Sequence, residues 1–521
     1  MSVVVSPLDK VIASFRPFCV PLHEAEVLPS VPFRIRPAPG LPAPETERFR
    51  RGDARHPFRV YGILDPHITN ADPPDAVPRG TASTQFKPLP NDTFQRLPMK
   101  ILFAFENPLP SAEADAEVFI TTARYLAPLT SQSWLHVPIS DGAGRDSIGT
   151  LAGMPVIPAY APIRPAALRH FCCGLTLIFR REFRQADLVY TRNLWVAWLA
   201  ILFGQRVAFD HYRPWPDQIP PLRLWLYRLI CNRRFLIKIC HSDYTRRKYL
   251  ELGIPEGKLR SIRNGFEPRR LQDALSIEAA KAAIGVAAGQ KTVVYTGRVN
   301  HKKGLHLVVE AARKLPQLLF LLVGSRGEGP IEALARDVPN VRFIPWQPPE
   351  ALRNYVFGAD VLLIPPSWQP LAEFGSTVLP LKLFFYLASG RPILAGATPD
   401  VQEVLRHGEN AFLCRPDCPD ALVAGLGALT GDDALAARLA ATALADSREF
   451  TWEARARKIA ALVEERLHAV PPERGGWGRS QFRAWMRQSR RWLVHLIRTR
   501  SWILPPDALL PASQAPLAEC E

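Results

Sequence analysis

One loop bounded by glycines carries residue types that can bind a phosphate. The run Gly297-Arg-Val-Asn-His-Lys-Lys-Gly304 follows an apolar, β-branched segment and precedes a segment with helical spacing. Arg298 and Lys303 are therefore expected at the carboxyl edge of a sheet, beside the first N–H groups of a helix. Two cations and a helix N-terminus suit a diphosphate, whose charge must be balanced as a leaving group departs. A basic loop that is simply solvated is the alternative, and spacing alone leaves both open.

The elements that would position this loop alternate between strand and helix. Apolar runs such as 101–105 and 292–295 predict buried strands, and each is followed by a segment with helical spacing. Such alternation predicts parallel sheets that are covered by helices on both faces. The pattern then restarts, so we expect two Rossmann-like, doubly wound α/β domains over 99–270 and 271–467. Domains of this kind bind ligands at the carboxyl ends of their strands, which predicts a central cleft faced by both sheets.

The composition is that of a large, basic and mostly folded protein. Of 521 residues, 47% are hydrophobic and 22% are charged, which excludes disorder of the whole chain. The formal net charge of +16 indicates anionic partners such as phosphorylated ligands, lipid headgroups or nucleic acid. Nucleic acid is the weakest of these explanations, because no known binding motif accompanies the charge.

Cysteines and apolar runs bear on the compartment. The eight cysteines are scattered, and no second Cys/His pair follows Cys414 and Cys418 at the spacing of a zinc site. The start of the sequence lacks the continuous apolar stretch of a secretory signal. The longest apolar run, 194–203, is far shorter than the roughly 20 residues of a membrane-spanning helix. We expect reduced thiols in a cytoplasmic protein that contacts a membrane only at its surface.

Both ends of the chain differ from the middle. Residues 1–98 contain 17 prolines and no sustained period, so we expect a disordered or loosely docked extension, with Met99 as an alternative start of the chain. The tail 468–521 is basic: 474–500 holds eight arginines and no acidic residue, with aromatic and aliphatic side chains at helical spacing. This pattern predicts an interfacial helix over 474–502 on an anionic membrane surface. Packing on the protein's own body is the alternative.

A series of further motifs resembles one enzyme family. The loop 297–304 is followed by Val323-Gly324-Ser325, by Ala359-Asp-Val-Leu-Leu-Ile-Pro-Pro-Ser367 and by Leu381-Lys-Leu-Phe-Phe-Tyr-Leu-Ala-Ser-Gly390. In this order the motifs resemble the GT-B glycosyltransferases of family 4, and the resemblance extends over about 99–467. It implies a GT-B fold and a retaining transfer from a nucleotide sugar that uses no metal ion and no other cofactor. The departing phosphate would help to deprotonate the acceptor hydroxyl, while the protein supplies orientation and charge.

The resemblance also implies roles for individual positions. Arg298 and Lys303 match the basic pair that holds the donor diphosphate. His211, at the end of a first-domain strand, matches the histidine that contacts the donor sugar, with a packed loop histidine as the alternative. Glu373 could face the donor from its loop, or it caps the next helix with its negative charge. The remaining donor-binding positions are Gly297, Gly324, Thr377, Leu381 and Phe385.

The sequence departs from the family pattern in two places. The family usually carries two glutamates where this sequence has Thr377 and Phe385, and the second is expected to accept hydrogen bonds from the ribose hydroxyls. A phenylalanine cannot accept them, and losing a charge-assisted pair costs about 1.5–3 kcal/mol, which weakens nucleotide binding roughly tenfold to a hundredfold. The glycine pair that usually follows the first strand is replaced by 110–113, so a close approach of backbone to ligand is less favoured there.

Together these expectations describe a cytoplasmic glycosyltransferase that is bound peripherally to the inner face of the membrane. It would move a sugar from a nucleotide sugar to a lipid-linked or polysaccharide acceptor in envelope glycan synthesis. One alternative is a catalytically silent homologue that acts as a binding or scaffold subunit, which Phe385 and the missing glycine pair favour. Another is a nucleotide-sugar epimerase, which the donor-side residues do not exclude. No pattern identifies the sugar, the base, the acceptor or the oligomeric state.

Overall fold

The computed structural model describes residues 97–109, 111, 114–138, 149–159, 164–213, 223–272, 274–370 and 379–471. The predictions made for the proline-rich extension and for the basic tail fall almost entirely on residues outside these ranges, and they stay predictions. No helix within the ranges has the length and apolar character that a bilayer crossing requires.

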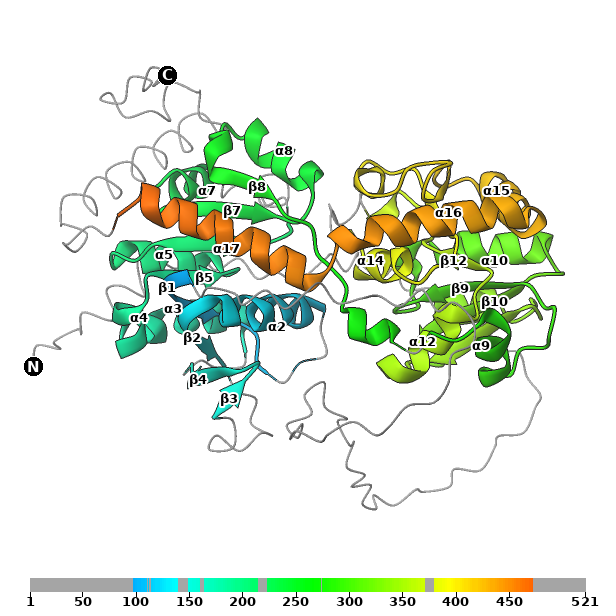
Figure 1. Ribbon diagram of the computed structural model, residues 1–521, viewed down its shortest axis with the longest axis horizontal. Helices are drawn as coiled ribbons and strands as arrows, with labels where there is room; N and C mark the ends of the chain where they lie inside the picture. Colours follow the sequence, from blue (N-terminus) through cyan, green and yellow to red (C-terminus); the bar gives the residue numbers. More distant parts are fainter. Residues whose placement is uncertain are drawn as a thin grey trace, which may run out of the picture. The chain divides into compact units, whose positions relative to one another are not determined.

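The first domain is built on a mainly parallel sheet (Figure 1). Its described strands follow the order β3-β4-β2-β1-β5-β6-β7-β8, and of these neighbours β3 and β4 alone are antiparallel. The strands are β1 (Leu97–Ala104), β2 (Thr130–Val137), β3 (Thr150–Leu151), β4 (Met154–Pro158), β5 (Leu188–Thr191), β6 (Val207–Asp210), β7 (Phe235–Cys240) and β8 (Leu259–Ser261). The helices are α2 (Ala114–Leu126), α3 (Ala166–Ile178), α4 (Arg181–Gln185), α5 (Leu194–Leu202), α7 (Arg223–Ile230) and α8 (Asp243–Glu251).

The second domain repeats the plan with a fully parallel sheet. Its described strands follow the order β11-β10-β9-β12-β13-β14. They are β9 (Thr292–Thr296), β10 (Leu319–Ser325), β11 (Val341–Pro345), β12 (Val361–Leu363), β13 (Ile393–Gly396) and β14 (Phe412–Cys414). The helices are α9 (Ile277–Ala283), α10 (Leu305–Lys314), α11 (Pro330–Leu334), α12 (Pro349–Phe357), α14 (Leu381–Leu387), α15 (Pro419–Gly431) and α16 (Asp433–Asp446). The prediction of two doubly wound α/β domains is therefore confirmed.

Strand order reverses once in each parallel sheet. In the second domain the chain moves outward from β9 to β10 and β11, and then returns to the other side of β9 as β12. In the first domain the reversal lies between β1 and β5. Loops that leave the two strands beside such a reversal diverge, and ligands of doubly wound folds bind at this point. In each sheet a site is therefore expected in the loops beside the reversal, which follow β1 and β5 in the first domain and β9 and β12 in the second.

Both faces of each sheet are buried, as expected from the continuous apolar strands. In β1, Ile101 joins the core on one face, and the next residue, Leu102, joins the core on the other. In β9, Val294 and Tyr295 divide in the same way. The alternation follows from the two-residue period of a strand, so side chains with chemical roles are left to the strand ends.

The last described helix packs in the first domain. α17 (Trp452–Ala469) follows the second domain in sequence, but it lies beside α2 of the first domain (Figure 1). Its Ile459 and Val463 side chains belong to the core that also includes residues of β1 and α2. Where the chain crosses back, the Phe266 N–H donates to the Phe450 carbonyl (2.9 Å). A segment that is distant in sequence thus completes the core of the first domain.

Candidate functional site

Two glycines bring the ends of β9 and β10 together. The Gly297 N–H donates to the Val323 carbonyl (2.9 Å). The two glycines, Gly297 and Gly324, have φ angles of 129° and 114°, which L side chains rarely adopt. A Cβ on Gly324 would lie 2.4 Å from the Gly297 carbonyl oxygen, so a side chain does not fit there. The loop after β9 is thereby held against the end of β10.

The basic loop runs from Gly297 to the start of α10. Arg298 and Lys303 both lie on it with exposed side chains. Gly304, with a φ of 70°, is the N-cap of α10, and a Cβ there would lie 2.5 Å from the Ser367 Cβ. This contact brings the loop after β12 against the start of α10. The two cations thus lie at the carboxyl edge of the second sheet beside its strand reversal, and their role in binding stays a prediction.

A third cation, to which the sequence pattern gave no role, lies against the same turn. The Nζ atom of Lys382 in α14 is 3.6 Å from the centroid of the Tyr295 ring in β9. The same atom would lie 2.9 Å from a Cβ on Gly297. The Tyr295 hydroxyl in turn donates to the Arg298 carbonyl (3.0 Å). The signal for Lys382 in the sequence is that it is the single charged residue in an otherwise apolar and aromatic helix, LKLFFYL.

These cations influence one another electrostatically. Partial burial and the charge of Arg298 lower the pKa of Lys303, although its side chain keeps contact with solvent. Burial and the charge of Lys303 hold the pKa of Lys382 well below its ordinary value. In the described part of the chain neither lysine has an acidic partner. An uncompensated positive potential of this kind favours an anion.

Apolar contacts occupy the rest of α14. Phe385 is half-buried and packs against the core on one face of the second sheet. Leu381, in the first turn, is half-buried as well. The buried Tyr386 hydroxyl accepts the Thr296 N–H (2.8 Å), which ties α14 to β9. This helix therefore offers no carboxylate to a ribose, and the role of Phe385 and Leu381 at the donor stays a prediction.

His211 follows β6 at the carboxyl edge of the first sheet. Its imidazole is buried, and its Nδ1 accepts the Arg213 N–H (3.0 Å), which assigns the ring proton to Nε2. Burial, and then the charges of Arg192 and Lys238, hold the pKa of His211 well below its ordinary value. The imidazole is therefore neutral at pH 7 and carries one N–H donor.

The carboxylate that precedes His211 serves the fold. Asp210 accepts hydrogen bonds from Tyr190, from His241 (2.7 Å) and from Arg455 of α17 (2.9 Å), and all four side chains are buried. Burial alone would raise the pKa of Asp210, but Arg455 and His241 hold it well below its ordinary value. Asp210 is thus an ionised anchor for α17, and its lone pairs are committed to these partners.

Two further charged residues lie at the strand reversal of the first sheet. Glu106 follows β1 and Arg192 follows β5, and the Arg192 Nε is 3.4 Å from the Glu106 Oε1. The Arg192 guanidinium also lies 3.0 Å from the Asp115 carboxylate and 5.5 Å from the centroid of the Tyr212 ring. The Glu106 Oε2 is buried and accepts no hydrogen bond from the described residues, and burial raises the pKa of Glu106. The available signal in the sequence was a charged residue within two positions of the end of a buried strand.

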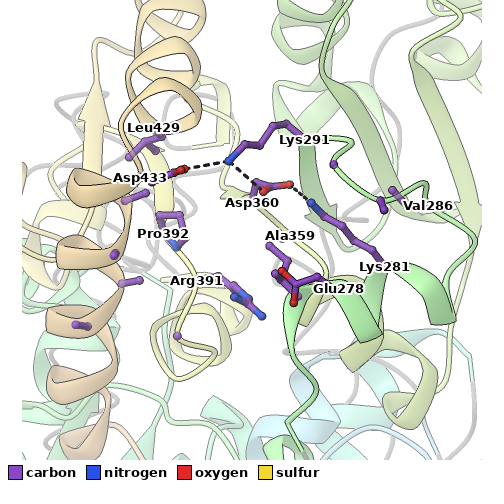
Figure 2. Close-up of a pocket in the computed structure, with 18 of the residues that line it drawn as sticks. Glu278, Lys281, Val286, Lys291, Ala359, Asp360, Arg391, Pro392, Leu429 and Asp433 are labelled. Carbon is purple, nitrogen blue, oxygen red and sulfur yellow. Dashed lines mark hydrogen bonds and ion pairs between the residues drawn. The ribbon is translucent and has the colours of Figure 1, made fainter.

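A hollow of about 610 Å³ lies at the other edge of the second sheet (Figure 2). Asp360 precedes β12 and Lys291 precedes β9, so the hollow is at the amino ends of these strands. The Lys281 Nζ is 2.6 Å from the Asp360 Oδ2, and the Lys291 Nζ is 3.0 Å from the Asp433 Oδ1. Figure 2 shows these charges paired with one another across the hollow, so they stabilise the packing of α9 and α16 on the sheet.

Part of the predicted site lies outside the described ranges. Glu373 and Thr377 belong to 371–378, and three of the four residues of 110–113 are also outside. Among the residues that are described, no cluster of three His, Cys, Asp or Glu side chains could hold a metal ion. The predicted transfer without a metal or cofactor stays a prediction.

Comparison with solved structures defines the fold. Sucrose-phosphate synthase from Thermosynechococcus elongatus matches with a TM-score of 0.59 at 19% identity, over 72% of this chain and 100% of that chain. HepE from Anabaena, in complex with UDP-glucose, matches with a TM-score of 0.54 at 19% identity, over 70% of this chain and 100% of its own. At these identities the similarity concerns the fold alone. The predicted GT-B fold is confirmed.

Sequence similarity to known glycosyltransferases extends over part of the chain. Residues 276–445 match the family described as glycosyl transferases group 1. D-inositol 3-phosphate glycosyltransferase from Xylanimonas cellulosilytica is 30% identical over 197 residues, 36% of this chain and 45% of that protein. Amylovoran biosynthesis glycosyltransferase AmsK from Erwinia amylovora is 25% identical over 314 residues, 57% of this chain and 69% of that protein. The chain spans about half the length of the first curated relatives it matches. These matches support a relationship of residues 276–445 to the group 1 glycosyltransferases, whereas family 4 stays a prediction.

Proposed function

We propose that this protein is a glycosyltransferase that moves a sugar from a nucleotide sugar to a hydroxyl group of an acceptor. The observation that carries the proposal is the position of Arg298 and Lys303 at the carboxyl end of β9, within the segment 276–445 that matches the group 1 glycosyltransferases. HepE, which shares the fold, has been solved with UDP-glucose and with UDP and glucose. A diphosphate at the strand reversal is the ligand chemistry that the two cations support.

The proposed chemistry is a retaining transfer without a metal ion. The bond between the sugar C1 and the diphosphate oxygen breaks, and a bond forms on the same face between C1 and the acceptor oxygen. The acceptor proton passes to the departing phosphate oxygen. Arg298 and Lys303 stabilise the negative charge that builds on the diphosphate. The neutral imidazole of His211 donates a hydrogen bond to a hydroxyl of the donor sugar and orients it.

The proposed acceptor is a lipid-linked or polysaccharide glycan at the cytoplasmic face of the membrane. One relative, AmsK, is named for the biosynthesis of amylovoran. In this chain the net charge of +16 and the arginine- and tryptophan-rich segment 474–502 support contact with an anionic surface. Envelope glycan synthesis is the process that combines these features.

A catalytically silent homologue that binds a partner or serves as a scaffold is the second candidate. One observation favours it: Phe385 packs against the core, and the helix that carries it contains no carboxylate for a ribose. Donor binding without turnover, or no donor binding, would follow from such a site. An epimerase differs from a transferase in its product, which is an altered nucleotide sugar with no transfer.

Calorimetric titration of the full chain with UDP, GDP and ADP tests the donor site. We expect saturable binding of one nucleotide and a loss of at least about tenfold in affinity for Arg298→Ala/Lys303→Ala, because a hydrogen bond to a charged group contributes about 1.5–3 kcal/mol. Arg313→Ala/Lys314→Ala is the matched control, since these exposed cations lie in the last turn of α10 and pair with exposed aspartates. The control is expected to bind like the wild type.

Turnover of the corresponding nucleotide sugar separates the candidate functions. A transferase releases the nucleoside diphosphate and forms a glycoside that keeps the anomeric configuration of the donor. A changed nucleotide sugar without release would identify an epimerase. A folded chain that binds no nucleotide at millimolar concentration would contradict the proposal and favour the silent homologue.

A further inference from the structure

Lys382 occupies an unusual place for a lysine. Its side chain is half-buried between α14 and β9, and its Nζ lies 3.6 Å from the centroid of the Tyr295 ring. The end of the same strand is close as well, because a Cβ on Gly297, which directly follows β9, would lie 2.9 Å from the same Nζ. The ammonium group is therefore at the turn where the loop with Arg298 begins.

Among the residues that the structure describes, none supplies a counter-charge to Lys382. Lys303, on the same loop, is a second cation that acts on it, and the two repel each other. Tyr295 does not provide an anion, because burial raises the pKa of its hydroxyl. Within the described ranges no acidic side chain forms a hydrogen bond or an ion pair with Lys382. Its ammonium group instead makes a cation–π contact with the Tyr295 ring.

An ammonium group that is partly removed from water beside a like charge is unfavourable unless a ligand compensates it. The contact with the Tyr295 ring recovers only a part of the lost hydration. A ligand with two adjacent negative charges would neutralise both lysines together. A diphosphate has this charge and the short spacing between its oxygens.

We propose that Lys382 binds the diphosphate of the donor together with Arg298 and Lys303, as a third cation that Tyr295 holds at the carboxyl end of β9. This inference rests on the proposed function and adds a binding residue to the same site. Tyr295 acts as a positioning residue, because its ring carries the Lys382 ammonium and its hydroxyl donates to the Arg298 carbonyl (3.0 Å). One aromatic side chain thus fixes two of the three cationic residues.

Proton uptake on binding is the first consequence. Burial and Lys303 hold the pKa of Lys382 well below its ordinary value in the empty site. A diphosphate adds negative charge and raises the pKa of Lys382 and of Lys303 towards ordinary values. Above the lowered pKa, a lysine that is neutral in the empty site therefore takes up a proton when the ligand binds. Tyr295 also faces Lys382, and it stays protonated throughout because burial raises the pKa of its hydroxyl.

Calorimetry with a diphosphate and its monophosphate tests the assignment. The probes are UDP, GDP and ADP, of which the tightest is used, and the monophosphate of the same base. For Lys382→Met, which keeps an apolar stem over Tyr295, we expect the affinity for the diphosphate to fall about tenfold to a hundredfold. Lys382→Arg is expected to retain most of it. Lys314→Met, an exposed lysine in the last turn of α10, is the control and leaves the affinity unchanged.

Two further readouts separate binding from a structural role. Titration at pH 8 in two buffers of different ionisation enthalpy is expected to show proton uptake by the wild type and less uptake by Lys382→Met. The melting temperature of the empty variant is expected to equal or exceed that of the wild type, because the substitution removes a poorly hydrated charge. If Lys382 had only a structural role, Lys382→Met would melt at a lower temperature than the wild type and take up as many protons on binding. It would also lose the same factor in affinity for the diphosphate and for the monophosphate.

The outcomes distinguish this inference from the function on which it rests. If the wild type binds a diphosphate and Arg298→Ala/Lys303→Ala weakens it, but Lys382→Met binds as tightly as the wild type, the assignment of Lys382 is wrong and the proposed function stands. If the folded wild type binds none of the three diphosphates, both are wrong.

Discussion

At the scale of single residues, the candidate site depends on where a side chain is missing. Gly297 and Gly324 allow the ends of β9 and β10 to approach so closely that a Cβ on Gly324 would lie 2.4 Å from a carbonyl oxygen. Both backbones also have positive φ, which costs little only for glycine. The position of the loop that carries Arg298 therefore depends on the lack of a Cβ atom at Gly297 and Gly324.

Gly324→Ala is expected to be destabilising and to weaken nucleotide binding. A strained backbone costs roughly 1–3 kcal/mol, and the contact with Gly297 would displace the loop that carries Arg298. Urea unfolding and calorimetric titration measure the two effects. Gly427→Ala is the control, since Gly427 lies in α15 with nothing within 4 Å of its Cβ position. Its variant should gain about 0.5–1 kcal/mol. Equal behaviour of the two variants would show that the close approach at Gly324 is not required.

At the scale of elements, α17 is joined to the first sheet by a buried ion pair. The Arg455 guanidinium lies 2.9 Å from the Asp210 carboxylate and donates to the Thr122 hydroxyl of α2 (3.2 Å). Asp210 ends β6 directly before His211, so the same contact that docks α17 also orders the strand end that presents the imidazole. Packing of a distant helix and geometry of the candidate site are thus coupled.

Arg455→Met is expected to lower the free energy of unfolding by about 3–5 kcal/mol, because it leaves the Asp210 carboxylate buried without its main cation. Chemical denaturation followed by tryptophan fluorescence measures the change. Arg457→Met, two residues along α17, removes a partly exposed pair with Glu453 and should cost less than about 1 kcal/mol. Arg455→Met/Asp210→Asn should recover part of the loss. Similar costs for the two single variants would exclude a special role for the buried pair.

At the scale of the whole molecule, the excess of positive charge is unevenly spread. The chain carries a net charge of +16, and eight of its arginines fall in 474–500, where no acidic residue occurs. Each basic residue near an anionic leaflet contributes about 1 kcal/mol to binding. A catalytic unit whose acceptor is lipid-linked would gain both residence and orientation at the membrane from such a segment.

Removal of 474–502 is expected to abolish co-sedimentation with vesicles that contain phosphatidylglycerol. The full chain should bind these vesicles at low ionic strength, should be released as salt screens the charges, and should not bind vesicles of phosphatidylcholine alone. Nucleotide affinity in solution serves as the control for folding and should be the same for both chains. Undiminished vesicle binding by the shortened chain would refute the role of the segment.

Local patterns in the sequence determined the element types, the division into two α/β domains and the place of one basic loop. The period of apolar residues and the glycines at turns are properties of a few neighbouring residues, so they can be read without knowing the partners of a strand. Arg298 and Lys303 were found in this way, because they stand directly between a predicted strand and a predicted helix. The arginine-rich tail was found from composition alone.

Only the tertiary structure decided which distant residues meet. Lys382 reaches Gly297 because α14 packs beside β9, and α17 returns to a sheet that was completed far earlier in the chain. Glu106 and Arg192 meet because β1 and β5 are neighbours in the sheet. The physical reason is that the spacing of apolar residues depends only on the helix or strand that contains them. Which side chains meet at the edge of a sheet depends on strand order and on packing between elements remote in sequence.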